Sequence, residues 1–538
     1  MPDNKTGTLT DHVEDGFTHE QSTATISYDN NGISGIIRSP YVFGAALLAS
    51  FGGFSFGYDQ GVVSLILTLP QFHAVFPEVA PGHARYGFNT GFMTGMLEFG
   101  AFVGCIFFPM LADRFSRKTG LAVATVFFCV GAVIQTASQN YGTLVAGRTI
   151  GGVGVGTLAM GAPLYISEVA PPNLRGSLLV LEAISIVVGA IIAYWITYGT
   201  RGIAGEWAFR LPFLLQMAPA LMVGIGIQFF PYSPRWLAMR HRDEDSLRSL
   251  ERLRRLPGAD ERVQMEWKGI LREVELQELV LHREHGADNN FIALEFKQWG
   301  DLFKPSCIRR TIVALAIPFF QQFSGINAFV YYAPIFFAAL GQSYEMSLIL
   351  SGMVNVCQFV AGIPTFLFLD KMGRRKLAIF GGIAMGVPHI IMAGIVSKYN
   401  GKWENDPGIG WFGVALILPS AKQVDLYVLA YASSYGPLAW TLPAEVFPSS
   451  KRAKGVGAAT AMVWLANFII GVIVPEMQLK LGWGTYLFFG CFCFAASVFS
   501  FFFVPETAGK SLEQMAGVFG DDLGDEEREL ETQGPHGH

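Results

Sequence analysis

The chain has 538 residues and a formal net charge of -5; 51% of its residues are hydrophobic and only 15% are charged. Soluble proteins carry about 25% charged residues, and the mean hydropathy here is +0.37. This composition argues against a soluble protein and indicates an integral membrane protein. The charges lie in loops and tails rather than on one basic face, so no nucleic-acid partner is implied.

Apolar runs long enough to cross a bilayer recur from Tyr41 to Phe503, and we count about twelve, each near the 17 to 25 residues that a spanning helix needs. They lack the period-two alternation of barrel strands, and a helix satisfies its own backbone hydrogen bonds in lipid. We therefore expect an all-α integral membrane protein. The predicted spans are 41–66, 88–112, 120–138, 141–166, 176–199, 211–231, 308–340, 346–369, 377–397, 424–444, 454–475 and 484–504.

Lysine and arginine gather on the cytosolic side of membrane proteins. Here they cluster at 114–118, 371–376 and 451–454, after the second, eighth and tenth runs, and the loops after odd-numbered runs are poorer in them. Both termini are therefore expected in the cytosol. The first forty residues are polar and acidic with no basic segment before a short apolar core, so no cleaved signal peptide is expected.

The six cysteines fall within the apolar runs, except Cys307, which lies at the edge of one. Small packed residues are the expected role, rather than disulfides or metal ligands. No Cys/His spacing resembles a metal site, and we expect neither a metal nor a cofactor.

Parts of the sequence occur twice. "EVAPPNLRG" at 168–176 has a counterpart in "EVFPSSKRAKG" at 445–455, and "DRFSRK" at 113–118 has one in "DKMGRRK" at 370–376. Motifs repeated in the same order predict two six-helix halves, a design of secondary transporters. The expected organisation is a cytosolic tail (1–40), a first half (41–231), a cytosolic linker (232–300), a second half (301–505) and an acidic cytosolic tail (506–538).

The linker is dense in Arg, Glu and Asp, yet Leu247, Leu250, Leu253 and Leu256 recur in it at helical spacing. This pattern predicts short amphipathic helices packed under the membrane bundle. The alternative is a solvated charged connection.

The repeated motifs, together with "GRTIGGVGVG" at 147–156, "PYSPRWL" at 231–237, "QQFSGINAFVYYAP" at 321–334 and "PETAGKSLEQM" at 505–515, resemble the sugar porter family of the major facilitator superfamily, most closely its fungal monosaccharide transporters. The resemblance covers about 40 to 520 of the numbering. It implies the major facilitator fold and a monomeric sugar transporter of the plasma membrane. The glycines of 147–156 are expected to allow close helix packing.

Charged residues at the cytosolic helix ends are expected to form a gate. The double proline of the first motif ends the fourth helix, so Glu168 closes that helix and Arg175 opens the fifth, and Glu445 and Arg452 repeat this relation. The alternative is that the charges only fix topology, a role that requires no glutamate. The resemblance implies a network that latches the two halves on the inside, made of Arg114, Arg117, Glu168, Arg175, Arg374, Arg375, Glu445 and Arg452.

Amide side chains crowd the seventh span, where each would be costly if left unpaired in lipid. Amides suit sugar hydroxyls because they donate and accept, although they also tie helices together. Gln322 and Asn327 share no face of a straight helix, so we expect unwinding near Gly325. The resemblance implies a substrate site of Phe56, Gln321, Gln322, Asn327, Tyr331, Asn355, Tyr431, Trp440 and Trp464; core packing is the alternative for Phe56 and Trp464.

Two positions depart from the family pattern. Ala183 stands where many relatives carry glutamine, and Val463 stands where many carry a polar residue. A site without these hydrogen-bonding partners discriminates differently between sugars. Xylose, galactose, a uronic acid and a polyol all remain open as substrates.

Asp59 lies inside the first span and Arg148 inside the fourth. Charges within the membrane are costly and usually functional, and a carboxylate beside an arginine can exchange its proton as the arginine moves. The resemblance implies that Asp59 is a proton acceptor, with a structural ion pair as the alternative. Glu98 and Glu182 match no family position, and we interpret them either as neutral hydrogen-bonding groups or as a second proton path.

The function predicted on these grounds is monosaccharide transport by alternating access, coupled to protons. An uncoupled uniporter and a polyol, sugar-acid or quinate transporter remain open. A transporter-like nutrient sensor is a further alternative, although the segment after Pro505 is shorter than the cytosolic tail that such sensors typically carry. An enzyme is not expected, since no motif supplies a nucleophile with its base or a phosphate-binding loop.

Overall fold

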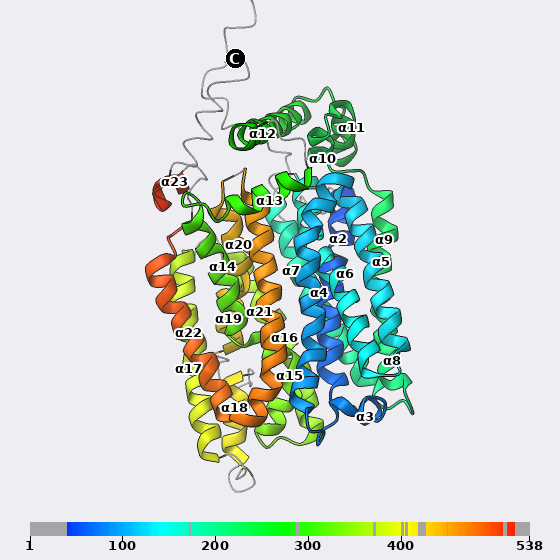
Figure 1. Ribbon diagram of the computed structural model, residues 1–538, viewed down its shortest axis with the longest axis vertical. Coiled ribbons are helices and arrows are strands. Elements are labelled where there is room, and N and C mark those ends of the chain that lie inside the picture. Colours follow the sequence, from blue (N-terminus) through cyan, green and yellow to red (C-terminus); the bar gives the residue numbers. More distant parts are fainter. Residues whose placement is uncertain are drawn as a thin grey trace, which may run out of the picture.

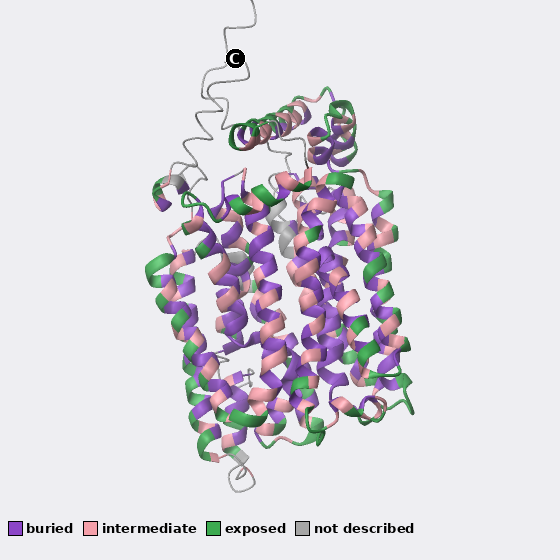
Figure 2. Cartoon of the chain, in the orientation of Figure 1, coloured by how far each residue is buried: buried purple, intermediate pink, exposed green. Residues whose placement is uncertain are grey.

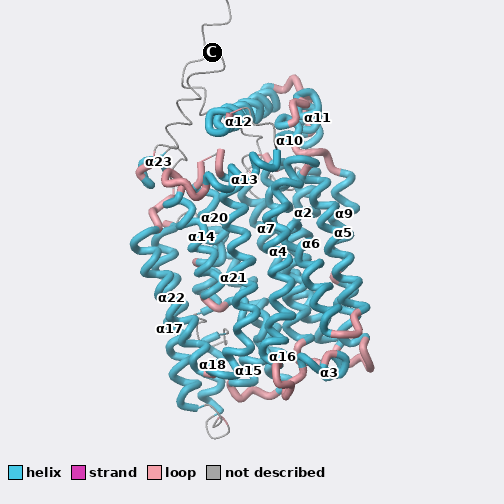
Figure 3. Tube along the Cα trace, in the orientation of Figure 1, coloured by secondary structure: helices cyan, strands magenta, loops and turns pink. Residues whose placement is uncertain are grey.

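The computed structural model describes residues 40–171, 174–286, 291–368, 373–399, 403, 407–417, 427–448, 450–508 and 514–521. Within these ranges every regular element is a helix (Figure 1 and Figure 3). Long helices run side by side as a bundle, and the helices α10 to α12, within residues 234–285, lie across one end of it.

The first half of the chain, blue to cyan in Figure 1, contributes the helices of one side of the bundle. They are α2 (Pro40–Ile66), α4 (Tyr86–Phe115), α5 (Arg117–Ala137), α6 (Tyr141–Val169), α7 (Arg175–Thr200), α8 (Trp207–Leu215) and α9 (Met217–Gly226), with the short α3 (Pro70–Val75) and the 3-10 helices η2 (Pro77–Val79) and η3 (Ile227–Phe229).

The second half, green to red, forms the other side of the bundle. Its helices are α14 (Ile308–Phe323), α15 (Ile326–Ala339), α16 (Tyr344–Phe368), α17 (Arg374–Tyr399), α18 (Pro407–Ile417), α19 (Tyr427–Ser433), α20 (Tyr435–Val446), α21 (Arg452–Leu481), α22 (Trp483–Phe503) and α23 (Gln514–Phe519). The helices between the halves are α10 (Pro234–Met239), α11 (Asp243–Arg254), α12 (Glu261–His285) and α13 (Phe291–Asp301).

Eleven helices within the described ranges are long and apolar enough to cross a membrane. The tenth predicted span differs from the expected single helix, because α19 and α20 are separated at Ser434, whose φ of -133° and ψ of -91° are not helical. Hydropathy gives the length of an apolar run and does not reveal a change of backbone conformation within it. A second difference is α18, which lies between the ninth and tenth predicted spans, where no helix was predicted.

The linker helices have the predicted amphipathic character. Leu250 and Leu253 are buried on α11, whose charged residues cover its other face. Leu247 is partly buried on the same helix, and Leu256 follows its end. The spacing of the leucines is therefore used for packing, as predicted, and the segment is not a solvated connection.

Burial follows the layout of a membrane bundle (Figure 2). Buried residues fill the inside, whereas large apolar side chains on the outer faces are exposed, among them Phe107 at 60%, Phe229 at 79% and Phe502 at 71%. Large apolar side chains on the outer faces suit contact with lipid chains.

Glycines let helices of the first half approach closely. On α2, a Cβ at Gly57 would collide with the carbonyl oxygen of Ile186 on α7. On α6, a Cβ at Gly152 would collide with the carbonyl oxygen of Leu97 on α4. Gly152 belongs to the glycine-rich motif, so the close helix packing predicted for that motif is confirmed.

A similar glycine row lies where the two halves meet. Gly87, Gly91 and Gly95 follow one another at intervals of one helical turn on α4, and a Cβ on any of them would press against α21. At Gly91 the obstacle is the backbone carbonyl of Val472. The two helices are therefore in backbone contact across the boundary between the halves.

We expect Gly57→Ala to destabilise the protein by about 1 to 3 kcal/mol, the usual cost of overpacking a tight contact. Gly199→Ala is the matched control on α7, because a Cβ at Gly199 meets no atom within 4 Å. Thermal unfolding of the two purified variants in detergent would compare them. Equal unfolding temperatures would mean that the α2 and α7 backbones can separate at no cost.

Candidate functional site

The seventh predicted span is broken at its amide-rich segment. α14 ends at Phe323 and α15 begins at Ile326, and between them Gly325 has a φ of +95°. This left-handed conformation favours glycine because it has no Cβ. The unwinding predicted near Gly325 is thereby confirmed.

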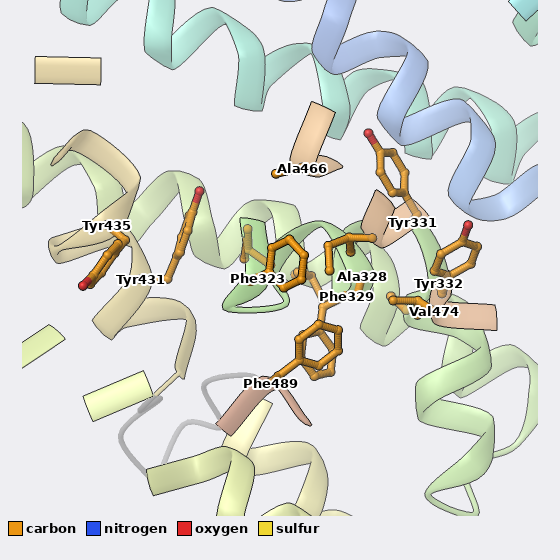
Figure 4. Close-up of a cluster of buried hydrophobic side chains, with 14 of the residues drawn as sticks. Phe323, Ala328, Phe329, Tyr331, Tyr332, Tyr431, Tyr435, Ala466, Val474 and Phe489 are labelled. Carbon is orange, nitrogen blue, oxygen red and sulfur yellow. The ribbon is translucent and has the colours of Figure 1, made fainter. Parts of the chain in front are cut away.

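The break frees the carbonyl oxygen of Ser324, and the second half supplies partners for it. His389 Nε2 on α17 lies 2.9 Å away and Tyr427 Oη on α19 donates at 3.0 Å. Sequence reasoning missed both residues, since neither stands in a motif. Figure 4 shows the aromatic packing around the break, with Phe323, Phe329 and Phe489 close together and Tyr331 directed toward the helices of the first half.

The amides expected to bind substrate form one hydrogen-bonded series. Gln321 Nε2 donates to the carbonyl oxygens of Tyr435 and Gly436, at 3.1 and 3.2 Å. Gln322 Nε2 donates to Gln321 Oε1 at 3.0 Å, and Asn327 Nδ2 donates to Gln322 Oε1 at 2.6 Å. These side chains point into one region and satisfy one another there.

One residue of the first half reaches this series. Gln60 Nε2 on α2 lies 3.4 Å from Asn327 Oδ1 and 3.2 Å from Tyr331 Oη. Tyr331 in turn contacts Glu98 on α4 and accepts a hydrogen bond from Asn467 Nδ2 on α21 at 3.2 Å. Gln60 and Asn467 were absent from the predicted site; only their polarity within an apolar run could have identified them.

The remaining predicted substrate residues lie on other helices. Phe56 and Trp464 form a T-shaped contact between the halves, with ring centroids 4.6 Å apart. Asn355 on α16 and Tyr431 on α19 are buried. Trp440 on α20 differs, since its side chain is 38% exposed and no described contact joins it to the amides.

Asp59 and Arg148 form the ion pair that the sequence suggests. Arg148 Nη1 and Nη2 donate to the two carboxylate oxygens of Asp59 at 3.2 and 3.1 Å, and both side chains are buried. The guanidinium also donates to the carbonyl oxygens of Met93 and Thr94 on α4, at 2.8 and 3.3 Å. Attraction between opposite charges is strong in the low dielectric of a buried site.

The predicted gate residues pair mainly within their own half. Arg117 Nε lies 2.9 Å from Glu168 Oε1, and Arg117 Nη1 lies 3.0 Å from Asp113. In the second half, Arg374 lies 2.9 Å from Glu445. Each repeated motif therefore stabilises the helix ends beside it, and the network that latches the two halves stays a prediction.

The other predicted gate residues have separate surroundings. Arg375 Nη2 donates to the carbonyl oxygen of Phe501 at 2.7 Å, and the Arg114 guanidinium lies over the Phe115 ring. Arg452 is the first residue of α21. The side chain of Arg175 lies outside the described residues.

A lysine outside the predicted gate joins the halves. Lys454 Nζ on α21 forms an ion pair with Glu295 on α13 and lies 4.0 Å from Asp113 at the end of α4. Nearby, Lys451 lies 2.9 Å from Glu284 on α12. The charged connection between the halves at this end therefore combines the direct contact of Lys454 with Asp113 and ion pairs to the linker helices.

One group of side chains in the described ranges has the spacing of metal ligands: Glu284, His285 and Asp301. Lysines already occupy it, since Lys304 Nζ lies 2.6 Å from Asp301 and Lys451 binds Glu284. Burial acts to raise the pKa of Asp301, but hydrogen bonds from Lys304 and His285 outweigh it, so that pKa is lowered. The group is an ion network that holds the linker rather than a metal site.

Comparisons with known proteins agree with this architecture. A family model described as "Sugar (and other) transporter" matches residues 45–519. The chain is 32% identical to a high-affinity glucose transporter of Kluyveromyces lactis over 90% of its own length and 85% of the relative. It is 31% identical to the low-affinity glucose transporter HXT3 of Saccharomyces cerevisiae over 88% of its length and 81% of the relative.

Among solved structures, the chain is similar to the proton:xylose symporter XylE bound to 6-bromo-6-deoxy-D-glucose, with a TM-score of 0.71 and 26% identity over 89% of this chain and 99% of that one. That structure belongs to the major facilitator superfamily. These families consist of transporters and not enzymes. The chain therefore belongs to the sugar transporter family of the major facilitator superfamily.

Proposed function

We propose that this protein moves a monosaccharide across the plasma membrane by alternating access, in symport with protons. One observation carries the proposal: two consecutive residues of α2 contact the two sites that symport must couple. Asp59 binds Arg148, and Gln60 binds Asn327 and Tyr331. A displacement of this turn of α2 therefore changes both the ion pair of Asp59 and the contacts of Gln60 with the amide series.

The chemistry follows from the charges. A proton on Asp59 removes the negative charge that holds Arg148, which weakens the ion pair and frees this part of α2 to move. Movement of α2 changes the distance between Gln60 and Asn327. The hydrogen bonds that the amides can offer to the sugar change with it. Proton binding then changes the affinity for sugar, and by linkage sugar binding changes the affinity for the proton by the same factor.

The relatives support a sugar as substrate, because two of them are named glucose transporters and the solved structure is named a proton:xylose symporter. Ala183 on α7 and Val463 on α21 supply no hydrogen-bonding group. A preference different from that of the glucose transporters follows from these two positions. Cytosolic termini, supported by the distribution of lysine and arginine, and a plasma-membrane location complete the proposal.

Uptake of labelled sugars by purified protein in liposomes tests this function. The panel should contain hexoses, pentoses, a polyol and a uronic acid, with and without an imposed inward proton gradient, for the wild type and Asp59→Asn. Accumulation above equilibrium that requires the gradient and Asp59 supports symport. Equilibration unaffected by the gradient indicates a uniporter, and absence of uptake for every compound contradicts the proposed function.

We further propose that the cytosolic charges form a gate, and we expect Glu168→Gln to slow sugar uptake by about tenfold. Its hydrogen bond from Arg117 is charge-assisted, and such bonds contribute about 1.5 to 3 kcal/mol. Sugar binding should persist, because Glu168 does not contact the amides. Asp245→Asn, which breaks an exposed ion pair on α11, is the control and should transport normally. Normal uptake by Glu168→Gln would mean that these charges only fix the membrane topology and do not form a gate.

A further inference from the structure

Glu98 is a buried carboxyl group with no cation bound to it. Glu98 lies on α4 and is 1% exposed. Its Oε1 accepts a hydrogen bond from Tyr331, whereas its Oε2 has no hydrogen-bond partner among the described residues. Arg148 is the nearby cation, but its guanidinium is directed to Asp59 and to two backbone carbonyls.

The surroundings fix the direction of the bond between Glu98 and Tyr331. The tyrosine oxygen accepts from Gln60 Nε2 and from Asn467 Nδ2, each at 3.2 Å. A phenol has one proton and two acceptor sites. With both acceptor sites in use, its single proton goes to Glu98 Oε1. A change in the protonation of Glu98 is therefore transmitted through Tyr331 to Gln60, which contacts Asn327 of the amide series.

An ionised carboxylate without a paired cation is expensive to bury, so the neutral acid is the stable form here. The charged and titratable groups that face Glu98 are Asp59 from α2, Arg148 from α6, and Tyr331 and Tyr332 from α15. The Asp59 carboxylate disfavours a second negative charge beside it, and Arg148 is committed to Asp59. On this geometry the proton of the neutral acid belongs on Oε2, the oxygen without a hydrogen-bond partner among the described residues.

We propose that Glu98 is a second proton-binding group of this transporter, and that Tyr331 couples its protonation to the sugar site. The inference rests on the proposed function and deepens it. One proton binds Oε2 from the outer solution and the same proton leaves to the cytosol, with no other covalent change. When Glu98 is ionised, its carboxylate competes with Tyr331 for Gln60 and Asn467, and Gln60 can then no longer hold Asn327 as it does here.

The test compares Glu98→Gln with Glu182→Gln in liposomes. Glu182 is the matched control, a buried carboxyl group of the same half on α7 that has no contact with Tyr331. Glu98→Gln should lose accumulation driven by a proton gradient while still exchanging internal for external sugar at equal pH. Glu182→Gln should keep both. Unchanged accumulation in Glu98→Gln, or equal loss in both variants, overturns the proposal.

Infrared spectroscopy separates this proposal from symport itself. A protonated carboxyl group gives a C=O stretch that Glu98→Gln should remove, and sugar addition should shift that band in the wild type but not in Tyr331→Phe. If the wild type never accumulates sugar yet shows this band and shift, symport is wrong and the proton on Glu98 stands. A band that survives in Glu98→Gln, or that sugar leaves unmoved, contradicts the role assigned to Glu98.

Discussion

Replacing Arg148 by methionine is expected to destabilise the protein by about 3 to 5 kcal/mol, the cost of leaving one partner of a buried ion pair alone. Asp59 would remain in the middle of the bundle with its charge unpaired. The carbonyl oxygens of Met93 and Thr94 would lose their donor as well. The change should appear as a large fall in the thermal unfolding temperature in detergent, together with low yield of folded protein.

The chain offers a close control for this experiment. Arg201 and Glu345 also form a two-point ion pair, at 3.1 and 2.9 Å, but the Glu345 side chain is 60% exposed. Arg201→Met should cost no more than about 1 kcal/mol, as exposed pairs usually do. Adding Asp59→Asn to Arg148→Met should recover part of the loss, because the buried group is then neutral. If Arg148→Met and Arg201→Met lower the unfolding temperature equally, burial does not make the ion pair of Asp59 and Arg148 more important for stability than the exposed pair.

Asn327→Ala is expected to weaken sugar binding by about 10- to 100-fold. Asn327 lies at the broken helix and holds both Gln322 and Gln60. Its loss removes one amide from the site and leaves a buried oxygen of Gln322 without its donor, at a combined cost of about 1.4 to 2.8 kcal/mol, where every 1.4 kcal/mol is tenfold in affinity. Quenching of tryptophan fluorescence by sugar, or the KM for sugar exchange, would measure it.

Asn89→Ala is the companion variant for that measurement. Asn89 on α4 donates to the carbonyl oxygen of Glu78 at 3.0 Å, outside the amide series. Its removal should leave the sugar affinity unchanged. An affinity of Asn327→Ala equal to that of Asn89→Ala would place the sugar elsewhere and assign the amides to helix packing.

The two broken helices show what the sequence can predict. At Gly325 the break was predicted because Gln322 and Asn327 cannot share a face of a straight helix. At Ser434 the sequence holds a different signal: Pro437 cannot donate the backbone hydrogen bond that Ser433 would accept in a continuous helix. Counting apolar residues does not use this signal, so the tenth span was predicted as one helix. The Ser434 side chain also packs where a Cβ on Gly381 of α17 would stand, a contact between helices that no local pattern predicts.

The charged groups show the same limit. The buried pair of Asp59 and Arg148 was predicted because isolated charges in apolar runs need partners. Glu98 was noticed for the same reason, but its partner Tyr331 lies 233 residues along the chain, and no spacing rule spans that distance. Lys454 was missed because its partner Glu295 belongs to a linker helix whose position follows from folding, not from the repeat.

The glycine row between α4 and α21 bears on where the barrier to transport lies. Side chains that interdigitate must leave their grooves before one helix can tilt on another. Along Gly87, Gly91 and Gly95 there are none to withdraw on the α4 side. At these three positions one helix can therefore tilt on the other without withdrawing a side chain of α4. The contacts that must break when one half turns on the other lie elsewhere between the halves, among them the ring contact of Phe56 with Trp464 and the hydrogen bonds of Gln60 to Asn327 and Tyr331.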